Sequence, residues 1–517
     1  GNGTARRGMT TQASPSTLSK DLLASVVVFL VALPLCMGIS IASGMPPTAG
    51  IITGIIGGII VGAIAGSPLQ VSGPAAGLSV LVLQFVQANG PEMLGIVVLF
   101  AGLLQLAAGT FKLGQWFRAV SPAVIHGMLA GIGVLILVAQ FHVMLDGKPI
   151  GTGIQNLIGM PGALIEAIQA GDHRLEAGAI GVLTILTIIG WSFAPKAWRL
   201  MPAPLVGVIV AMIAAAVLGL ADIHYVDVPN NIWSTVAWPT PENLARIIEA
   251  PIFIGAISVA FIASAETLLC ATAVDQMHSG ERTKYDKELA AQGVGNALCG
   301  LLGVLPMTGV IVRSGANVDA GAVTRASAIL HGVWLLIFAS ALPWTLSYIP
   351  ISALAAVLVY TGYKLAYPKI VPTLQKYGTS EVAIYFITIA VIVATNLLAG
   401  VVVGLVLSLL KLLYAFSHLE VRKEEKAGRV DLYLKGAATL IRLPMLAAEL
   451  EGLKPNTHVH VHIDELDYID HACIDLLTNW DRQHKTTGGS LEIEWEGLTQ
   501  KYKQRSSLRA RAEATGR

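Results

Sequence analysis

The sequence contains few charged residues. They make up only 13% of its 517 residues, whereas a soluble globular domain carries about 25%. Its 34 lysines and arginines balance 33 aspartates and glutamates, which leaves a formal net charge of +1. This balance excludes a strongly basic nucleic-acid-binding protein and an acidic tail protein. Hydrophobic residues, at 54%, are too abundant for a disordered chain.

Cysteine is scarce as well. The four cysteines, at positions 36, 270, 299 and 473, are scattered and form no CxxC pair. Neither a disulfide framework nor a metal site is therefore indicated. The sequence also contains no nucleotide-binding loop and no nucleophile–base pair at a catalytic spacing. We therefore expect neither an enzyme nor a cofactor.

Long apolar segments dominate the first four fifths of the chain. About 20 apolar residues cross a bilayer as a helix, and twelve segments of roughly that kind can be recognised. Two further segments, 74–88 and 310–319, are short and interrupted by Gly or Pro, which is typical of half-helices. The fold class predicted is an α-helical polytopic membrane protein with 14 transmembrane elements. The twelve spans lie near residues 21–43, 47–66, 91–110, 121–145, 175–194, 201–221, 251–273, 287–305, 323–345, 350–366, 379–397 and 399–417.

Basic residues are distributed unevenly over the connections between these spans. With the N-terminus in the cytoplasm, the cytoplasmic connections hold eleven lysines and arginines and the opposite connections only three. The positive-inside rule then predicts that both termini are cytoplasmic. The expected domains are a cytoplasmic segment (1–20), a transport domain (21–418), a small soluble domain (419–497) and a basic, largely disordered tail (498–517).

The two short segments occupy matching positions, each the third element in a group of seven. They read QVSGPAAGLSVLV (70–82) and LPMTGVIVRSGANV (305–318). Because seven is odd, the second group enters the membrane with the opposite orientation, as in inverted-repeat secondary transporters. Ordinary kinks at Gly and Pro are the alternative interpretation. The last spans of the two groups, 204–215 and 397–410, also resemble each other, which favours the repeat.

Half-helices that meet near the bilayer midplane would direct their N-termini at each other. Each N-terminus offers unpaired N–H groups and about half a positive charge. The small residues Ala75, Ala76, Gly77 and Gly309 would let a ligand approach the backbone. The pattern therefore favours a small anionic substrate over a cation.

Two ionisable residues, Glu266 and Arg313, fall inside predicted membrane segments. A charge at the bilayer centre costs roughly 2.5–3.5 kcal/mol, so such residues usually have a function. Arg313 would add positive potential beside the anion, and Glu266 would carry a coupling proton or help to bind Na⁺. Alternatively, the two residues form a structural ion pair that fixes helix packing. Packing roles are expected for the intramembrane histidines, for Gln140 and for Cys270.

Four segments together resemble the SulP family of anion transporters. They are ALPLCMGISIASGMPPTAG (32–50), QVSGPAAG (70–77), KELAAQGVGNALCGLLG (287–303) and PMTGVIVRSGAN (306–317), and their order and spacing match along nearly the whole chain. The resemblance implies a 7+7 inverted repeat with core and gate subdomains, elevator-like alternating access and a homodimer. It also implies a cytoplasmic C-terminal STAS domain, a small α/β domain.

The polar segment after residue 418 fits this resemblance. HVHVHIDELDYIDHACIDLLTNW (458–480) indicates a buried strand, a loop and a helix, similar to a STAS core with Asp470 as its loop aspartate. Many STAS domains outside transporters have a phosphorylatable serine two positions later, where this chain has Ala472. A serine-phosphorylation switch at that position is therefore not expected.

The resemblance also implies the residues of the substrate site. Many relatives read Ser-Phe-Ser-Arg in the tenth element, where three aliphatic residues precede the arginine here. This less polar site favours a singly charged or weakly hydrated anion over sulfate. The substrate-binding residues implied are Leu35 and Ile39 in the first span, Ala75, Ala76, Gly77 and Leu78 in the third element, and Val310, Ile311, Val312 and Arg313 in the tenth.

Glu266 and Cys270 are implied as the coupling-ion residues. Glu266 falls at the acidic position of the eighth span, which is Asp in Na⁺-dependent bicarbonate transporters of cyanobacteria, with Thr one turn later. Here Cys270 stands in place of that Thr, and Na⁺ prefers oxygen ligands. Having Cys270 in place of Thr weakens the case for Na⁺ as the coupling ion and favours a proton carried by Glu266.

The expected function is secondary active transport of small inorganic anions, bicarbonate first, in a bacterial inner membrane. The segments LVALPLCMGI, GSPLQVSGPAAG and AILHGVWLL resemble a branch with members linked to carbonic anhydrase. A sulfate or other oxyanion or dicarboxylate symporter and an anion exchanger are alternatives, followed by a passive channel or a STAS-linked sensor. A nucleobase–cation symporter shares the architecture but lacks a STAS domain. The expected partners are the anion, membrane lipid and a second copy of the chain, without nucleic acid.

Overall fold

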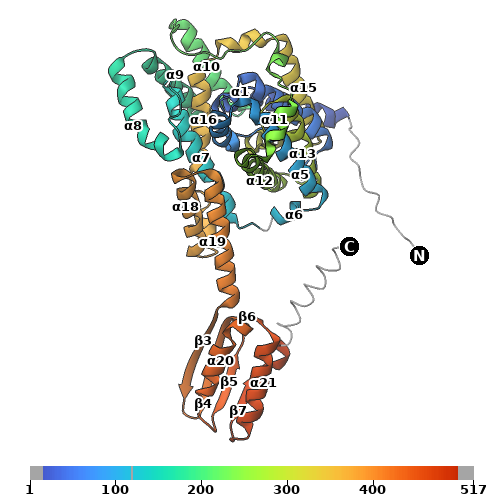
Figure 1. Cartoon of the computed structure of the whole chain (residues 1–517), viewed down its shortest axis with the longest axis vertical. Coiled ribbons are helices and arrows are strands. Elements are labelled where there is room, and N and C mark those ends of the chain that lie inside the picture. Colours follow the sequence, from blue (N-terminus) through green and yellow to red (C-terminus); the bar gives the residue numbers. More distant parts are fainter. Residues whose placement is uncertain (1–14, 118–119, 499–517) are drawn as a thin grey trace, which may run out of the picture. The chain divides into compact units, whose positions relative to one another are not determined.

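The computed structural model describes residues 15–117 and 120–498, which belong to two compact units (Figure 1). The first unit ends at Leu405 and the second begins at Val406, within helix α19 (Leu397–Ser417). Residues 1–14 of the predicted N-terminal segment and residues 499–517 of the predicted basic tail lie outside the described residues.

The first unit consists almost entirely of helices. Seven helical segments of the described chain are long and apolar enough to cross a membrane, and four apolar helices are shorter. In the first half the helices are α1 (Pro15–Ala42), α2 (Pro47–Ile56), α3 (Gly62–Ile64), α4 (Ser79–Asn89), α5 (Leu94–Thr110), α6 (Gly114–Phe117), α7 (Pro122–Met144), α8 (Gly153–Ala170), α9 (His173–Trp191), α10 (Ala203–Val217) and α11 (Pro241–Ala245). In the second half they are α12 (Ala250–Asp275), α13 (Tyr285–Leu302), α14 (Ile311–Asp319), α15 (Ala326–Ala341), α16 (Ile351–Ala366), α17 (Val371–Gln375), α18 (Thr379–Ala394) and α19.

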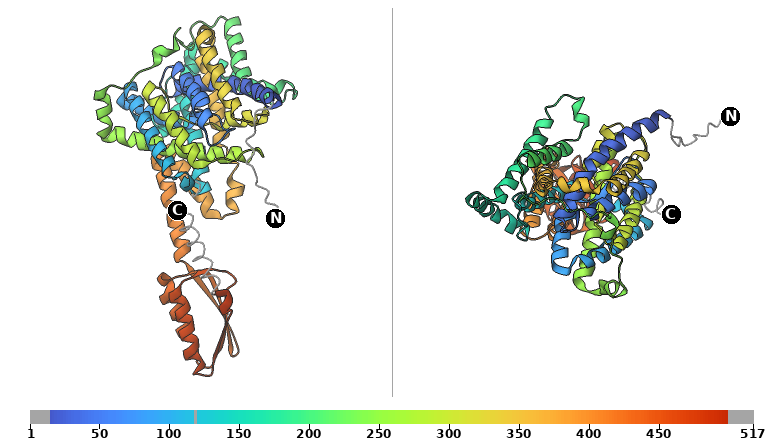
Figure 2. Two further views of the ribbon diagram at one scale, coloured as in Figure 1. Left: turned by 90° about the vertical axis from the view of Figure 1, so that its right-hand side faces the viewer. Right: turned by 90° about the horizontal axis from the view of Figure 1, so that it is seen from above.

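The packing of these helices is symmetric under exchange of the two halves. Helix α5 packs on α12 and α13, and its counterpart α15 packs on α1 and α2. In the same way α7 contacts α18, while its counterpart α16 contacts α9. Helices α7 and α16 also pack directly on each other. This pattern agrees with the predicted inverted repeat and separates a core group (α1–α5 and α12–α15) from a gate group (α7, α9, α10, α16, α18 and α19). Figure 2 shows α7–α9, in cyan and teal, to one side of the blue α1 and α2.

Helix α8 is an element that the prediction of spans missed. Its polar residues lower the mean hydropathy below that of a spanning segment, so hydropathy does not predict residues 153–170 as a span. The local signals for a helix are nevertheless present. Thr152 and Gln155 form a capping box, and Gly171 ends the helix with φ 59°.

Glycines hold the centre of the core group together. Gly95, Gly102 and Gly109 recur every seven residues on α5 and face the backbone of α13. A Cβ at Gly102 would meet the Ala297 nitrogen and would lie 2.7 Å from the Gly293 oxygen. Two helices approach this closely only where side chains are absent, as is typical of small-residue contacts in membranes.

We expect Gly102→Val to lower the stability of the first unit. Branched carbons at this position must separate α5 from α13, and such overpacking costs about 1–3 kcal/mol. The measurement is the thermal unfolding midpoint in detergent. Gly162→Val is the matched control, because no heavy atom lies within 4 Å of a Cβ at this helical glycine. Equal midpoints for the two variants would contradict the close packing of α5 on α13.

The second unit contains a five-stranded sheet. Its strands are β3 (Leu419–Lys426), β4 (Arg429–Ala438), β5 (His458–His462), β6 (Leu466–Ile469) and β7 (Ser490–Ile493), in the order β3-β4-β5-β7 with β6 also paired to β4. The β3–β4 pair is antiparallel and the other pairs are parallel. Helices α20 (Leu443–Glu451) and α21 (His471–Lys485) cover one face of the sheet (Figure 1).

The alternation of apolar and polar residues along β5 explains which face of the sheet the two helices cover. Val459 and Val461 are buried with Leu446 and Leu477 of the two helices, while the intervening histidines point to the other face. The predicted loop after β5 contains the short strand β6. Asp470 is the N-cap of α21 and accepts hydrogen bonds from the Cys473 and Leu440 N–H groups. The assignment of residues 419–497 to a STAS domain stays a prediction.

The open face of this sheet provides a pH-dependent contact. His462 Nε2 donates to Asp431 Oδ1 at 3.2 Å, and this hydrogen bond, with Arg429 nearby, lowers the pKa of the Asp431 carboxyl. A carboxylate whose pKa is lower in the folded state stabilises the fold above its unfolded pKa of about 3.9. That stabilisation disappears as the pH falls through the folded pKa.

We therefore expect Asp431→Asn to speed amide hydrogen exchange in β4 and β5 at neutral pH. The difference from the unmodified chain should shrink as the pH falls below about 4. The measurement is exchange of the full chain, monitored by mass spectrometry. His458→Gln, which removes a contact to Ser490 only, is the control. A difference that does not change with pH would contradict this role of Asp431.

Candidate functional site

Two three-residue strands cross at the centre of the core group. Strand β1 (Ser72–Pro74) pairs antiparallel with β2 (Met307–Gly309), with Gly73 opposite Thr308. The one-turn helix η2 (Ala76–Leu78) and α4 follow β1, and α14 follows β2. Because the strands are antiparallel, the two helices leave the crossing in opposite directions and both N-termini face it. The predicted half-helices thus meet as expected.

Neither N-terminus is capped by its own side chain. The N-cap residues are Ala75 and Val310, and neither makes a side-chain cap hydrogen bond. The Val310 N–H is bonded to the Val71 oxygen, whereas the N–H groups of the first turn of α14 have no partner within their helix. Two partial positive charges are therefore directed at the same small region.

A buried polar row on α13 holds the crossing in place. Glu288, Gln292 and Asn296 are spaced four residues apart and are fully buried. Asn296 binds the backbone of Met307 in both directions, at 2.7 and 3.1 Å, and Gln292 donates to the Ser72 hydroxyl at 2.6 Å. Our sequence analysis missed these residues. The i, i+4, i+8 spacing of polar residues within an apolar segment was the available signal.

Arg313 is fully buried on α14, and its guanidinium lies between Gly73 of β1 and Cys36 of α1. Its Nη2 donates to Cys36 Sγ on α1 at 3.0 Å. A Cβ at Gly73 would collide with the guanidinium, so only glycine fits at this position of the strand. The Nε and Nη1 groups have no hydrogen-bond partner among the described residues. No acid of the described chain pairs with Arg313, so the region around β1 contains an uncompensated positive charge.

Glu266 lies on α12, against the first turn of η2. Its side chain is half-buried, and a Cβ at Gly77 would lie 2.6 Å from Oε2. The Oε2 atom itself is buried and has no hydrogen-bond partner in the described part of the chain. The neighbouring Thr267 accepts the Gly309 N–H at 3.1 Å, so that α12 touches both half-helices. The structure does not form the alternative Glu266–Arg313 ion pair.

Cys270 points into an apolar part of the core. It is buried beside Leu69 and Val274, and its thiol lies 3.8 Å from the Ser314 hydroxyl. The same hydroxyl accepts the Val71 N–H at 2.9 Å. Cys270 therefore packs between α12 and α14 and does not contact Glu266 through a recorded hydrogen bond.

The other predicted substrate-binding residues differ in exposure. Buried side chains or backbone positions are Leu35, Ile39, Ala75, Gly77 and Leu78. Ala76, Val310 and Ile311 are half-buried, and 41% of Val312 is exposed. The structure thus brings the third and tenth elements together at the crossing, and the start of α14 is its more accessible side.

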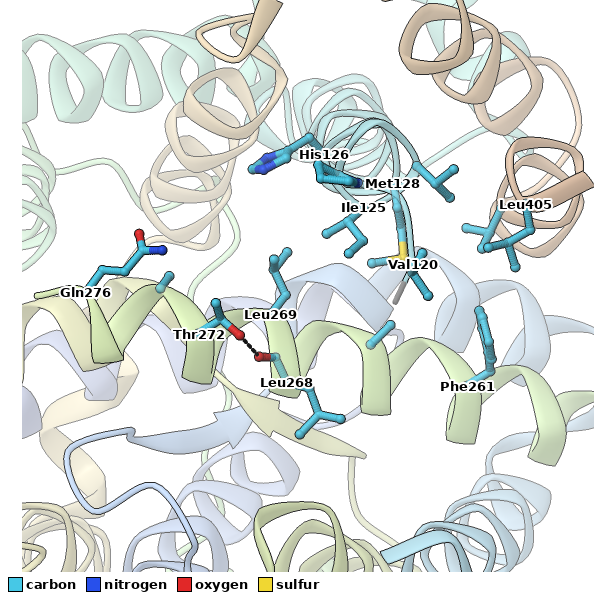
Figure 3. Close-up of a pocket in the computed structure, with 15 residues that line it drawn as sticks. Val120, Ile125, His126, Met128, Phe261, Leu268, Leu269, Thr272, Gln276 and Leu405 are labelled. Carbon is cyan, nitrogen blue, oxygen red and sulfur yellow. Dashed lines mark hydrogen bonds between the residues drawn. The ribbon is translucent and has the colours of Figure 1, made fainter. Parts of the chain in front are cut away.

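A cavity of about 430 Å³ lies between α12, α7 and the first turns of α19 (Figure 3). Its wall includes residues from the start of α7 and the end of α12, and also Ala265, the neighbour of Glu266. None of the ten predicted substrate-binding residues lines it. The lining residues that our sequence analysis did not assign to the site include His126, Phe261, Leu268, Leu269, Thr272 and Gln276. The Thr272 hydroxyl donates to the Leu268 oxygen, which leaves His126 and Gln276 as polar groups facing the cavity (Figure 3).

Comparison with known proteins identifies relatives along most of the chain. The profile of the sulfate permease family matches residues 18–388. A Bacillus subtilis protein provisionally named as the sulfate transporter YvdB is 27% identical over 92% of this chain and 91% of its own length. The bicarbonate transporter BicA of Picosynechococcus is 22% identical over 80% of this chain and 73% of its own length.

Two solved structures are similar in fold. The transmembrane domain of a cyanobacterial bicarbonate transporter BicA superposes with a TM-score of 0.63 and 25% identity, over 75% of this chain and 98% of that domain. The murine Solute Carrier 26 family member A9 anion transporter, in the inward-facing state, superposes with a TM-score of 0.72 and 13% identity, over 93% of this chain and 86% of its own. These likenesses confirm the predicted helical membrane fold.

Proposed function

Because the chain belongs to the sulfate permease family, a family of transporters and not of enzymes, we propose that it is a secondary active transporter of small inorganic anions. The proposed substrate is bicarbonate, taken up together with H⁺ or Na⁺. The family membership confirms the resemblance found in the sequence and the expectation of a transporter. Substrate, coupling ion and mechanism are parts of the proposal.

The observation that supports an anion most directly is the uncompensated positive potential at the crossing. Two uncapped helix N-termini each contribute about half a positive charge. The buried Arg313 guanidinium adds a full charge, and two of its nitrogens have no hydrogen-bond partner among the described residues. Burying such a charge alone is costly, and a bound anion between the N-termini would compensate it.

The side chains at the site favour a singly charged anion. Val310, Ile311 and Val312 offer no hydroxyl, so backbone N–H groups would be the main ligands. Fewer hydrogen bonds are then available to replace the hydration of a doubly charged ion. The naming of BicA as a bicarbonate transporter supports this choice, and the naming of YvdB supports sulfate as the second candidate.

Glu266 is the proposed coupling residue. Its Oε2 lacks a partner and lies beside the N-terminal turn of η2, so that its charge state alters the potential that the anion experiences. Cys270 supplies sulfur where a Na⁺ site would need oxygen, and the Ser314 hydroxyl beside it already binds the backbone of Val71. We therefore favour H⁺ over Na⁺. No other cofactor is needed.

Alternating access would occur by movement of the core group relative to the gate group. The cavity lies between α12 of the core and α7 and α19 of the gate, which is where an elevator-like displacement would open a path. With both termini in the cytoplasm of a bacterial cell, the cavity would open inward. A homodimer in the inner membrane and a functional link to carbonic anhydrase belong to the same proposal.

Val310→Asp tests the anion site. An aspartate is a favourable N-cap, so the variant should fold, but its carboxylate would occupy the N–H groups that the anion needs. We expect bicarbonate uptake into proteoliposomes to fall to the level of empty liposomes. Val310→Asn supplies a neutral cap and should keep more of the uptake. Unchanged uptake by Val310→Asp would contradict a site between the half-helix N-termini.

A further inference from the structure

Three potential metal ligands meet at one end of the gate group, away from the crossing. Asp146 follows α7, His173 is the first residue of α9, and His224 lies in the connection after α10. One ligand atom from each lies within 4.8 Å of the other two. No sequence pattern predicts this cluster, because its members come from three connections and have no motif spacing.

Asp146 is the fixed member of the cluster. Its side chain is 0% exposed, and its backbone adopts φ 56°, which is uncommon for a residue other than glycine. Oδ2 accepts the His224 N–H at 3.2 Å, whereas Oδ1 is buried without a hydrogen-bond partner among the described residues. This free oxygen lies 3.9 Å from Nδ1 of His224. A buried carboxylate oxygen of Asp146 therefore faces the imidazole of His224 without a hydrogen bond to it.

The two histidines are accessible and can adjust. The exposed fractions of their side chains are 34% for His173 and 60% for His224, and their ring centroids are 5.9 Å apart. Asp172 Oδ2 lies 3.8 Å from His173 Nδ1, and the Arg174 guanidinium donates to both oxygens of the same carboxylate. A metal-bound histidine usually donates its other ring N–H to a carboxylate, and Asp172 would take this role once the His173 ring turns to within hydrogen-bond distance.

We propose that Asp146, His173 and His224 form a binding site for a divalent transition metal of the Zn²⁺ class. Two imidazoles and a carboxylate are a donor set that suits Zn²⁺, with water at the fourth position. Tetrahedral ligands at about 2.0–2.1 Å from the metal lie about 3.3 Å apart. Rotations of the two histidine rings toward Asp146 would bring the ligand atoms, now within 4.8 Å of one another, to this separation.

A metal at this position would tie together three connections of the gate group. The His224 segment is also attached to the start of α16, since the Val226 N–H donates to the Ile349 oxygen and the Ile351 N–H donates to the His224 oxygen. The ends of α7, α9, α10 and α16 would then be linked through one ion. Such a link would make the gate more rigid without touching the anion site, so the proposal does not depend on the transported substrate.

The test is Zn²⁺ binding to the full-length protein in detergent, purified through a tag without histidine and measured by titration against a fluorescent chelator. Co²⁺ absorption spectroscopy reports the ligand set independently. We expect one tight site per chain, weakened about 100-fold or more in His173→Ala and in His224→Ala, and about tenfold in Asp172→Asn. Neither histidine is buried, so their variants should fold, which size-exclusion chromatography checks.

Strand β5 supplies the matched control. His458, His460 and His462 lie on the open face of the second unit's sheet and could bind Zn²⁺ independently. The double variant His460→Gln and His462→Gln should keep the tight site. Loss of the site in this control, its survival in both His173→Ala and His224→Ala, or no tight binding by the unmodified chain would overturn the proposal.

Discussion

Replacing Glu266 with glutamine is expected to abolish anion accumulation driven by an ion gradient. The variant keeps the size of the side chain beside Gly77 but cannot change its charge. If Glu266 carries the coupling proton, uptake against a concentration gradient should fall to the level of empty liposomes. Exchange of labelled for unlabelled anion should persist, because the crossing and Arg313 are unchanged. The measurement compares both activities in the same proteoliposomes.

This comparison also separates a symporter from a passive channel. In a channel Glu266 would be structural, and Glu266→Gln would leave the gradient-independent flux of the unmodified chain intact. Glu249→Gln is the control, because Glu249 is the N-cap residue of the same helix and lines neither the crossing nor the cavity. Gradient-driven accumulation by Glu266→Gln at the unmodified level would exclude Glu266 as the coupling residue.

Replacing Arg313 with methionine is expected to remove most of the anion affinity. The guanidinium is fully buried, and the bound anion is its proposed counter-charge. Removal of one member of a buried charge pair costs about 2–5 kcal/mol, which corresponds to at least roughly 30-fold weaker binding. The measurement is the bicarbonate concentration that gives half of the maximal rise in the thermal unfolding midpoint of the purified protein.

Two further variants separate the effect of the Arg313 charge from that of its hydrogen bonds. Cys36→Ala removes the recorded hydrogen-bond partner of the guanidinium but keeps the charge, and should change the affinity little. Arg313→Lys keeps a charge without the planar donors and should have an intermediate effect. Wild-type affinity in Arg313→Met would mean that Arg313 serves packing and that the N-termini alone bind the anion.

The sequence was sufficient to predict the half-helices and their meeting. Gly and Pro interruptions at matching places in two groups of seven segments led directly to the crossing that β1 and β2 form. The strands themselves were not predicted, because three residues such as Ser72–Pro74 are too few for an alternating pattern. The polar row of α13 was overlooked for a different reason. Its spacing was visible, but its partners lie on distant segments.

The geometry around the two intramembrane charges could not be predicted from the sequence. Glu266 and Arg313 allowed either an ion pair or separate roles, and only the structure places one beside Gly77 and the other beside Gly73 and Cys36. Helix α8 is too polar to be recognised as a span from hydropathy, and its clearest local signal is the capping box at Thr152. The Asp146 cluster depends on three connections whose proximity no local pattern encodes.

Labelled-bicarbonate uptake into proteoliposomes tests the central claim most directly. A proton gradient and a Na⁺ gradient are imposed separately, sulfate is added as competitor, and empty liposomes correct for CO₂ leakage. The account predicts accumulation driven by the proton gradient, inhibited weakly by sulfate and absent in Glu266→Gln. Accumulation driven by Na⁺ alone would contradict the proton role of Glu266, and transport of sulfate without bicarbonate would contradict the proposed substrate.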